Sequence, residues 1–328
     1  MPLGGSPPTC CRRLPAQTGL SRPLGVPESL PVADAAWIGP RLAVFDSHTT
    51  ASVIPRGFEG YARILHPARR GDTGGEQQVR WSEVASWSGA ALTRTVQFQQ
   101  IALPAHPVSG APPWESGPRE GPLAAAEGAI LAEILATASQ VNLTCWFGVW
   151  DGYGDLDILP QPLLGQERLD LPHRRYLLYR GTVRDALRFV PALGRTPNLW
   201  WPEDHSWFVA SEVDLDWTYV AGPLDTISGL LAETRLETRP VELGEPYQAI
   251  VAEAARALRD QGSCTISTPL GTIDGRLAGS GAGPRLEIER QQSSGYGSGR
   301  SRTLIGPGQP DHLESHLGMA LKMLTQNP

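Results

Sequence analysis

Lysine is almost absent from this sequence. Lys322 is the only lysine among 28 basic residues, so arginine supplies the other 27. Arginine side chains bind phosphate groups when they cluster, but here they are scattered along the chain. We therefore interpret the imbalance as the codon bias of a GC-rich genome rather than as a phosphate-binding surface.

Cysteine and long apolar runs are scarce as well. The adjacent pair Cys10 and Cys11 and the distant Cys145 and Cys264 fit neither a disulfide framework nor a zinc site. No run reaches the roughly 18 apolar residues of a membrane helix, and the N-terminus lacks the apolar segment of a secretory signal. These absences favour a cytoplasmic protein that does not associate with membranes.

The negative charge is concentrated in the middle of the chain. Residues 44–244 hold 24 carboxylates against 16 arginines, which gives −8 for this part and −6 for the whole chain. Nucleic acid needs a basic face, so this balance argues against it as a ligand. A basic protein partner suits the charge better.

Proline content and hydrophobic pattern divide the chain into three parts. Residues 1–40 are rich in Pro and Gly without apolar periodicity, which predicts a disordered tail. Residues 41–243 contain short apolar runs and amphipathic segments, which predict a Trp-rich α+β domain with a central mixed or antiparallel sheet and packed helices. Residues 244–328 predict a small α-β-β-β-α unit.

The expected elements of the central domain follow from the apolar spacing. The predicted strands are Leu42–Phe45, Ser52–Ile54, Tyr61–Leu65, Thr144–Trp150, Tyr176–Tyr179, Ser206–Val213, Thr218–Ala221 and the edge strand Leu236–Val241. The predicted helices are Trp81–Trp87, Leu123–Ala138, Val183–Val190 and Leu224–Leu231. In the C-terminal unit, a helix over Tyr247–Arg259 precedes strands Cys264–Ser267, Thr272–Leu277 and Leu286–Glu289, a Gly/Ser loop over Ser293–Arg302 and a helix over His312–Leu324.

The segment Asn198–Gly222 holds the most informative residues. Trp200 and Trp201 are adjacent, so in a strand they point to opposite faces. Either both faces are covered, and the indoles are core residues, or one indole is exposed beside Glu203 and Asp204. An exposed indole there would be a hot spot for a protein partner or, for Trp201 with Glu203, a platform for a sugar.

Three carboxylates follow in the same segment. If Ser206–Trp217 is one strand, Glu212, Asp214 and Asp216 share a face. The simplest interpretation is a solvated strand face. A Mg²⁺ or Ca²⁺ site is an alternative, although no calcium-loop spacing is present, and recognition of a basic partner is a third. The candidate binding residues are therefore Trp200, Trp201, Glu203, Asp204, Glu212, Asp214 and Asp216.

Other motifs give weaker signals. His312 and His316 have the spacing of half a zinc site, but no third ligand can be named and Leu313 stands where a metalloprotease has Glu. The glycine run at 295–299 lies between predicted strands and does not fit a dinucleotide loop. His205 has no nucleophile that can be placed beside it. No cofactor, resident metal or catalytic set is expected.

Several blocks of the sequence resemble a set of uncharacterised actinobacterial proteins. The blocks are LWWPEDHSWFVASEVDLDWTYVAG, GFEGYARILHPA, VRWSEVA and CWFGVWDGYG, within residues 40–243. The resemblance implies no activity and no functional residues.

The leading hypothesis is a non-enzymatic protein that binds a protein partner, in an immunity-type or regulatory role, through an acidic, Trp-bearing face. The second hypothesis is a metal-assisted hydrolase that uses Glu212, Asp214 and Asp216 with Asp151 or His205. The third is a carbohydrate-binding module.

Overall fold

The computed structural model describes residues 35–45, 48–72, 75–102, 108–138, 143–156, 168–172, 174–247, 249–268, 271–278, 285–292, 300–307 and 317. Its main element is an eight-stranded sheet in the order β10-β1-β9-β8-β7-β4-β6-β5, in which every neighbouring pair is antiparallel. The strands are β1 (Gly60–Leu65), β4 (Cys145–Trp150), β5 (Arg168–Asp170), β6 (Arg175–Gly181), β7 (Leu199–Pro202), β8 (Phe208–Ala210), β9 (Trp217–Gly222) and β10 (Thr238–Pro240).

Side chains alternate between the two faces of this sheet, and both faces are covered. In β7, Trp200 joins one hydrophobic core and Trp201 joins the other. In β4, Trp146 and Phe147 divide in the same way. A strand that is buried on both sides has no polar face, which explains why these strands are nearly continuous apolar runs.

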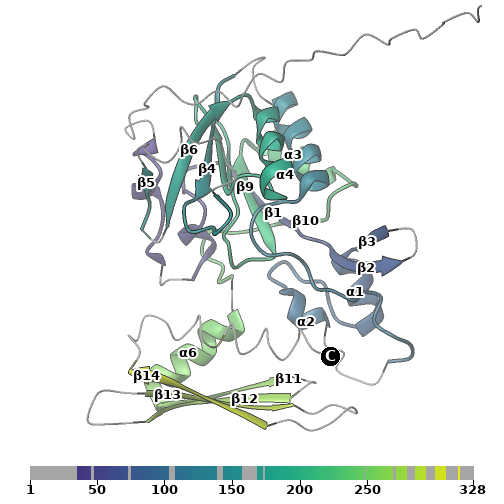
Figure 1. Cartoon of the computed structure of the whole chain (residues 1–328), viewed down its shortest axis with the longest axis vertical. Coiled ribbons are helices and arrows are strands. Elements are labelled where there is room, and N and C mark those ends of the chain that lie inside the picture. Colours follow the sequence, from purple (N-terminus) through teal and green to yellow (C-terminus); the bar gives the residue numbers. More distant parts are fainter. Residues whose placement is uncertain are drawn as a thin grey trace, which may run out of the picture.

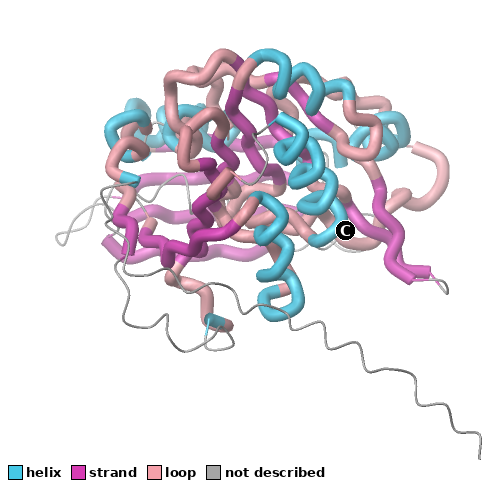
Figure 2. Tube along the Cα trace, turned by 90° about the horizontal axis from the view of Figure 1, so that it is seen from above, coloured by secondary structure: helices cyan, strands magenta, loops and turns pink. Residues whose placement is uncertain are grey.

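Helices cover one face of the sheet (Figures 1 and 2). They are α3 (Ala125–Ala138), the 3-10 helix η7 (Val183–Phe189), α4 (Val190–Leu193) and α5 (Leu224–Ala232). Leu131 and Leu135 of α3 point into this core with Ile227 of α5, following the apolar stripe of an amphipathic helix.

Irregular segments and two short helices cover the other face. They comprise the described residues between Ala35 and Phe58, α1 (Trp81–Ser88) and α2 (Phe98–Ala102). A two-stranded hairpin of β2 (Ala68–Asp72) and β3 (Gly75–Val79) leads into α1.

The N-terminal part of the described chain differs from the prediction. Residues 35–40 were predicted to belong to the disordered tail, but Ala35 and Ile38 are buried in the core. The strands predicted at Leu42–Phe45 and Ser52–Ile54 are wrong, because residues 42–44 are irregular after the 3-10 turn Gly39–Arg41 and a second 3-10 turn occupies Thr50–Ser52. Leu42, Val53 and Ile54 pack into the core over the sheet without joining it, whereas Val44 is 74% exposed. Short apolar runs do not reveal which of these arrangements occurs.

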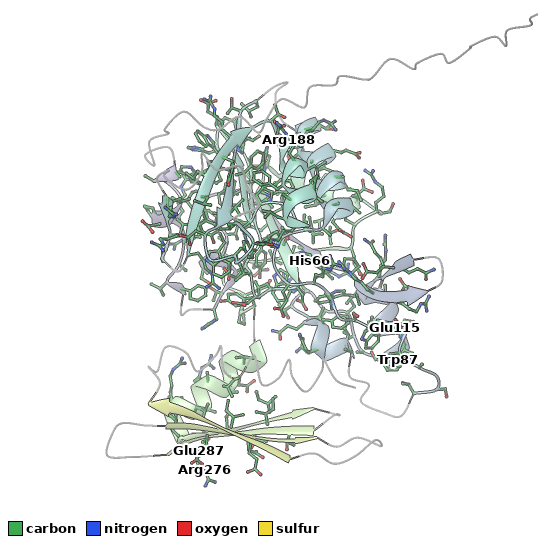
Figure 3. All side chains as sticks on the ribbon, viewed as in Figure 1. His66, Trp87, Glu115, Arg188, Arg276 and Glu287 are labelled. Atoms are coloured by element: carbon green, nitrogen blue, oxygen red, sulfur yellow. The ribbon has the colours of Figure 1, made fainter. Side chains whose placement is uncertain are left out.

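The C-terminal unit is a four-stranded antiparallel sheet with one helix packed on it (Figure 1). The helix is α6 (Ala249–Gln261), and the strands are β11 (Ser263–Thr268), β12 (Gly271–Ala278), β13 (Arg285–Gln292) and β14 (Arg300–Pro307). The prediction missed β14, which begins inside the expected Gly/Ser loop. The opposite face is polar, with Arg276 and Glu287 paired across β12 and β13 (Figure 3). Of the helix expected at His312–Leu324, only Leu317 lies within the described residues.

The segment before α6 runs along the central unit. Its backbone exchanges hydrogen bonds with residues 48–51, including Thr50 N to Glu245 O at 2.9 Å and Tyr247 N to His48 O at 3.0 Å. The α+β class with an antiparallel central sheet is confirmed. Among the described residues, no helix has the length and apolarity that a membrane span requires.

Candidate functional site

The three clustered carboxylates lie in a loop instead of on one strand. β8 ends at Ala210 and β9 begins at Trp217, so Glu212, Asp214 and Asp216 occupy the connection of a β-hairpin. Glu212 and Asp216 are buried, whereas the Asp214 side chain is 64% exposed. The shared solvated strand face is therefore wrong, because the chain turns where the prediction extended it.

Arg174 joins two of these carboxylates. Its Nε and Nη2 atoms donate to Glu212 Oε1 at 3.1 and 2.6 Å, and Nη2 also donates to Asp214 Oδ2 at 3.0 Å. Burial opposes the charge of Arg174, but the charge of Glu212 and its hydrogen bond raise the pKa of the guanidinium. A guanidinium on two carboxylates forms a fixed ion-pair network, which is how these acidic groups are satisfied.

The same guanidinium covers a half-buried tryptophan. The Arg174 Cζ atom lies 5.1 Å from the centre of the Trp150 ring, and Trp150 packs edge-to-face on Tyr153 at 5.0 Å. Arg195 lies 3.9 Å from the Tyr153 ring centre and pairs with Asp155 at 2.6 Å. Both rings are therefore held between cations at one end of the sheet.

Further ion pairs border these rings. Asp151 accepts from Arg168 at 3.2 Å and from Arg175 at 3.3 Å. We call this group the Trp150 surface; it comprises Trp150, Asp151, Tyr153, Asp155, Arg174, Arg175, Arg195 and Asp214. It combines partly exposed aromatic rings with alternating charges.

The tryptophans nominated from the sequence are core residues. Trp200 and Trp201 are both 0% exposed. The Trp200 indole donates to the carbonyl oxygen of Pro197 at 2.9 Å, and the Trp201 ring stacks near Trp146 and Phe208. The alternative of an exposed indole at these two positions is wrong, because layers cover both faces of β7.

Glu203 and Asp204 are exposed, but they lie at the other end of β8 from Glu212. They form the turn between β7 and β8, where Asp204 Oδ1 accepts from Ser206 N at 3.0 Å. His205 in the same turn stacks on Trp37 at 4.4 Å. The structure therefore separates the candidate binding residues into a buried pair of indoles, an acidic turn and the Glu212 loop.

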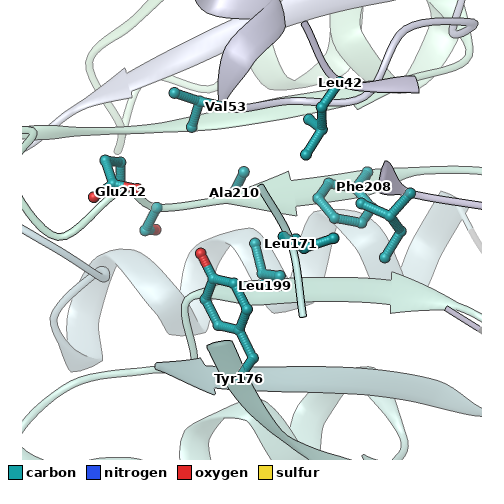
Figure 4. Close-up of a pocket in the computed structure, with 10 residues that line it drawn as sticks. Leu42, Val53, Leu171, Tyr176, Leu199, Phe208, Ala210 and Glu212 are labelled. Atoms are coloured by element: carbon teal, nitrogen blue, oxygen red, sulfur yellow. The ribbon is translucent and has the colours of Figure 1, made fainter. Parts of the chain in front are cut away.

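A small pocket lies beside the Glu212 loop (Figure 4). Its enclosed volume is about 10 Å³, which is roughly the space of one water molecule. Its apolar walls are Ile38, Leu42, Val53, Leu171, Leu199, Phe208 and Ala210, and its polar groups are Tyr176, Ser211 and Glu212. Burial, and then the charge of Glu212, raise the pKa of the Tyr176 hydroxyl well above 10, so this group stays protonated.

A chain of hydrogen bonds leads from this pocket to His66, a buried histidine of the central unit, which is labelled in Figure 3. Ser211 Oγ lies 2.7 Å from Thr218 Oγ1, and Thr218 Oγ1 lies 3.0 Å from His66 Nε2. His66 Nδ1 donates to the carbonyl oxygen of Arg119 at 2.7 Å. Burial lowers the pKa of His66 to about 4, so the ring is neutral at pH 7.

The described residues do not support the metal hypothesis. Among them, no group of three His, Cys, Asp or Glu side chains lies close enough together to hold a metal ion. Glu212 and Asp214 contact a guanidinium instead. His312, His316 and the glycine run at 295–299 lie outside the described residues.

Sequence reasoning missed the residues that build this end of the sheet. Trp150 is the last residue of β4 and Tyr153 lies three residues beyond it, and of this stretch only Asp151 was named, as a candidate of the hydrolase hypothesis. Arg174 carries no local signal, since its partner Glu212 is 38 residues away.

Compared with family models, with curated proteins and with solved structures, the chain matches none of them.

Proposed function

We propose that this chain is a non-enzymatic protein that binds a protein partner through the Trp150 surface. The observation that carries this proposal is the pair of partly exposed rings, Trp150 and Tyr153, each covered by an arginine that a carboxylate holds in place. Trp, Tyr and Arg are the residue types that most often dominate binding energy at protein interfaces.

The rigidity of this surface supports the proposal. Arg174 and Arg195 are fixed by ion pairs of 2.6 Å, and Asn198 Nδ2 donates to the Tyr153 hydroxyl at 3.0 Å. Side chains that are already ordered lose little conformational entropy when a partner binds. The partner would therefore meet a preformed set of rings and charges.

The charge balance favours a basic partner. Residues 44–244 carry −8, and Asp214, the most exposed carboxylate of the network, lies at the rim beside Arg174. Opposite charge across an interface speeds association and selects the partner. An immunity-type or regulatory role agrees with such a partner.

The Trp201 ring is fully buried, so Trp201 and Glu203 do not form an exposed platform for a sugar. The hydrolase hypothesis would need Glu212 and Asp214 to exchange Arg174 for a metal ion.

Site-specific photo-crosslinking tests the proposal. A benzophenone side chain is introduced at Tyr153, or at the control position Leu231, an exposed residue of α5, and the crosslinked protein is identified in native cells. We expect one dominant partner from position 153 that is absent from position 231. Equal capture from both positions, or none from 153, would contradict the proposal.

Calorimetry with the purified partner then measures the contribution of the surface. We expect Trp150→Ala and Asp214→Arg to weaken binding at least tenfold, as hot-spot changes do, and Leu231→Ala to leave the Kd within twofold. Asp214→Arg also breaks the ion pair with Arg174, so its loss of binding is assigned to the interface only if urea unfolding and circular dichroism stay those of the wild type.

A further inference from the structure

Most sheet edges of this protein carry a feature that discourages pairing with another strand. In the large sheet, the edge strands β5 and β10 are three residues long, and each contains at least one charged residue. In the C-terminal sheet, the edge strand β14 contains Arg300 and Arg302, ends at Pro307 and shifts register against β13. In the two-stranded sheet, Ser116 bridges to β2, and β3 contains Glu76. Short length, charge, proline, bulges and covering loops are the devices that keep such edges unpaired.

The strand β11 (Ser263–Thr268) is the one edge without such a feature among the strands that the structure describes. Its sequence, SCTIST, contains no charged residue and no proline, and it pairs with β12 without a bulge. It is the outermost strand of the C-terminal sheet, and no described strand lies on its other side (Figure 1). The Ser263 and Thr265 residues are exposed. This edge is therefore suited to receive a further strand.

The hydrogen bonds to β12 fix which backbone groups of β11 face outward. Leu277 N donates to Gly262 O at 2.8 Å, directly before β11 begins. Residues of an antiparallel strand bond alternately to one neighbour and to the other, so Cys264 and every second residue after it bond to β12. The residues whose N–H and C=O groups point to the outer edge are Ser263, Thr265 and Ser267.

These outward groups are complementary to those of a second copy of β11. A two-fold axis beside Thr265 places Thr265 opposite Thr265 of the second copy, and it places Ser263 opposite Ser267. The two residues of such a pair exchange both of their hydrogen bonds, so the outward groups of both strands are satisfied together. Because β11 has no charge, no like charges meet across the pair.

The same pairing keeps the two faces of the sheet in register. Cys264 of one copy lies opposite Ile266 of the other, and both side chains are buried in the core beneath α6. An axis perpendicular to the sheet leaves the α6 helices of both copies on the same face. A strand from another protein would have to match this alternation of apolar and polar residues, whereas a second copy matches it by symmetry.

We propose that β11 pairs with β11 of a second copy, which joins two four-stranded sheets into one continuous antiparallel sheet. The pairing uses none of the residues of the Trp150 surface, so it does not depend on the proposed function. A single strand edge is a small contact compared with the interfaces of obligate dimers. We therefore expect a reversible dimer with a micromolar Kd.

Sedimentation velocity of the full-length chain over a range of concentrations tests this dimer. Thr265→Pro removes the N–H group beside the two-fold axis, and an edge strand tolerates proline where the N–H faces outward. We expect it to raise the dimer Kd at least tenfold. Thr265→Val is the matched control, since it loses the same hydroxyl, which donates to Asp274 at 2.6 Å, but keeps the N–H group. It should leave the Kd within twofold.

A second pair of variants decides the question if circular dichroism shows that Thr265→Pro is misfolded. Thr265→Glu places two carboxylates opposite each other in the dimer. We expect it to weaken the dimer at least tenfold at low salt and to recover at about 1 M salt, where the Debye length is about 3 Å. Thr272→Glu adds the same charge to the same face of β12, one strand further from the axis, and should leave the Kd unchanged.

Two results would overturn the proposal. A wild-type chain that stays monomeric at about 1 mM, far above a micromolar Kd, would show that this edge does not bind a second copy. A dimer that is equally stable in the wild type, in Thr265→Glu and in any folded Thr265→Pro would show that the copies associate through another surface.

Discussion

The Nε2 atom of His66 lies 3.0 Å from the Oγ1 atom of Thr218, and both side chains are buried in the central unit. The imidazole thus spans from a β9 hydroxyl to the carbonyl oxygen of Arg119. Protonation of Nε2 would place a second hydrogen against the Thr218 hydroxyl, which would have to reverse its hydrogen bond.

This arrangement predicts a loss of stability in mild acid. The His66 pKa is lowered from 6.5 to about 4, mainly by burial and further by the charge of Arg69, although the hydrogen bond to Arg119 opposes this. Between these values the unfolded chain binds a proton that the folded chain does not, so stability falls as the pH falls from about 6.5 to about 4. At about 1.4 kcal/mol per pH unit, the lowering of the pKa from 6.5 to about 4 limits the contribution of His66 to at most about 3–4 kcal/mol.

Urea unfolding of the wild type and of His66→Asn between pH 7 and pH 4.5 measures this contribution. Asparagine keeps a donor for Arg119 O but does not titrate. We expect a steeper loss of stability in the wild type, since all other groups are common to both proteins. Parallel curves would show that His66 is not the titrating group.

Removing the buried Arg63 guanidinium is expected to lower the free energy of unfolding substantially. Its Nη2 atom donates to the carbonyl oxygens of Arg94 and Val96, both at 2.7 Å, and its Cζ lies 4.9 Å from the Trp217 ring centre. Arg63→Met would leave two carbonyl oxygens without that donor, so we expect a loss of about 2–4 kcal/mol in urea unfolding. Arg184→Met, at an exposed position of η7, should change stability by less than about 0.5 kcal/mol. Equal losses of stability in Arg63→Met and Arg184→Met would show that the buried hydrogen bonds of Arg63 do not stabilise the fold.

The two adjacent buried tryptophans, Trp200 and Trp201, differ in one hydrogen bond, so their substitutions can be compared directly. Trp200 donates its indole N–H to Pro197 O, whereas the Trp201 indole nitrogen has no hydrogen-bond partner among the described residues. Each Trp→Phe change opens a similar space, but only Trp200→Phe also breaks a buried hydrogen bond. We expect Trp200→Phe to cost about 1 kcal/mol more than Trp201→Phe in urea unfolding. Equal or reversed costs would mean that this hydrogen bond adds nothing.

Gly152 controls the position of the Trp150 ring. A Cβ atom at Gly152 would overlap the Trp150 indole, whereas one at Gly154 would meet nothing within 4 Å. We expect Gly152→Ala to displace the ring and to weaken partner binding at least tenfold, and Gly154→Ala to leave the Kd unchanged. Tryptophan fluorescence and calorimetry check the two effects. Wild-type affinity in Gly152→Ala would remove Trp150 from the interface.

Local pattern was sufficient for the regular elements of the central unit. The stripe of Leu131 and Leu135 identified α3, and the short, mainly apolar run around Val220 identified β9. The segment Leu236–Val241, which contains Pro240, was predicted as an edge strand, and β10 is at one edge of the sheet. Proline cannot donate to a neighbouring strand, so its position at an edge follows from its chemistry.

Elements whose identity depends on neighbours were missed. Strand β7 begins at Leu199 within a segment recognised only for its tryptophans, and its pairing with β4 and β8 decides that both indoles are buried. The segment Leu42–Phe45 has the apolar residues of a strand, but it lies over the sheet outside the hydrogen-bonded ladder. Composition alone cannot distinguish a strand of the sheet from an irregular segment that packs on the face of the sheet.

The sequence alone determined the α+β class, the main helices, most strands and the excess of negative charge, because side-chain periodicity and composition are local properties. Only the tertiary structure decided which charged and aromatic side chains meet. Arg174 and Glu212 are separated by 38 residues, and they come together because the start of β6 and the β8–β9 turn lie at the same end of one sheet. Strand order is a non-local property, so the Trp150 surface and its pocket exist only once the sheet has assembled.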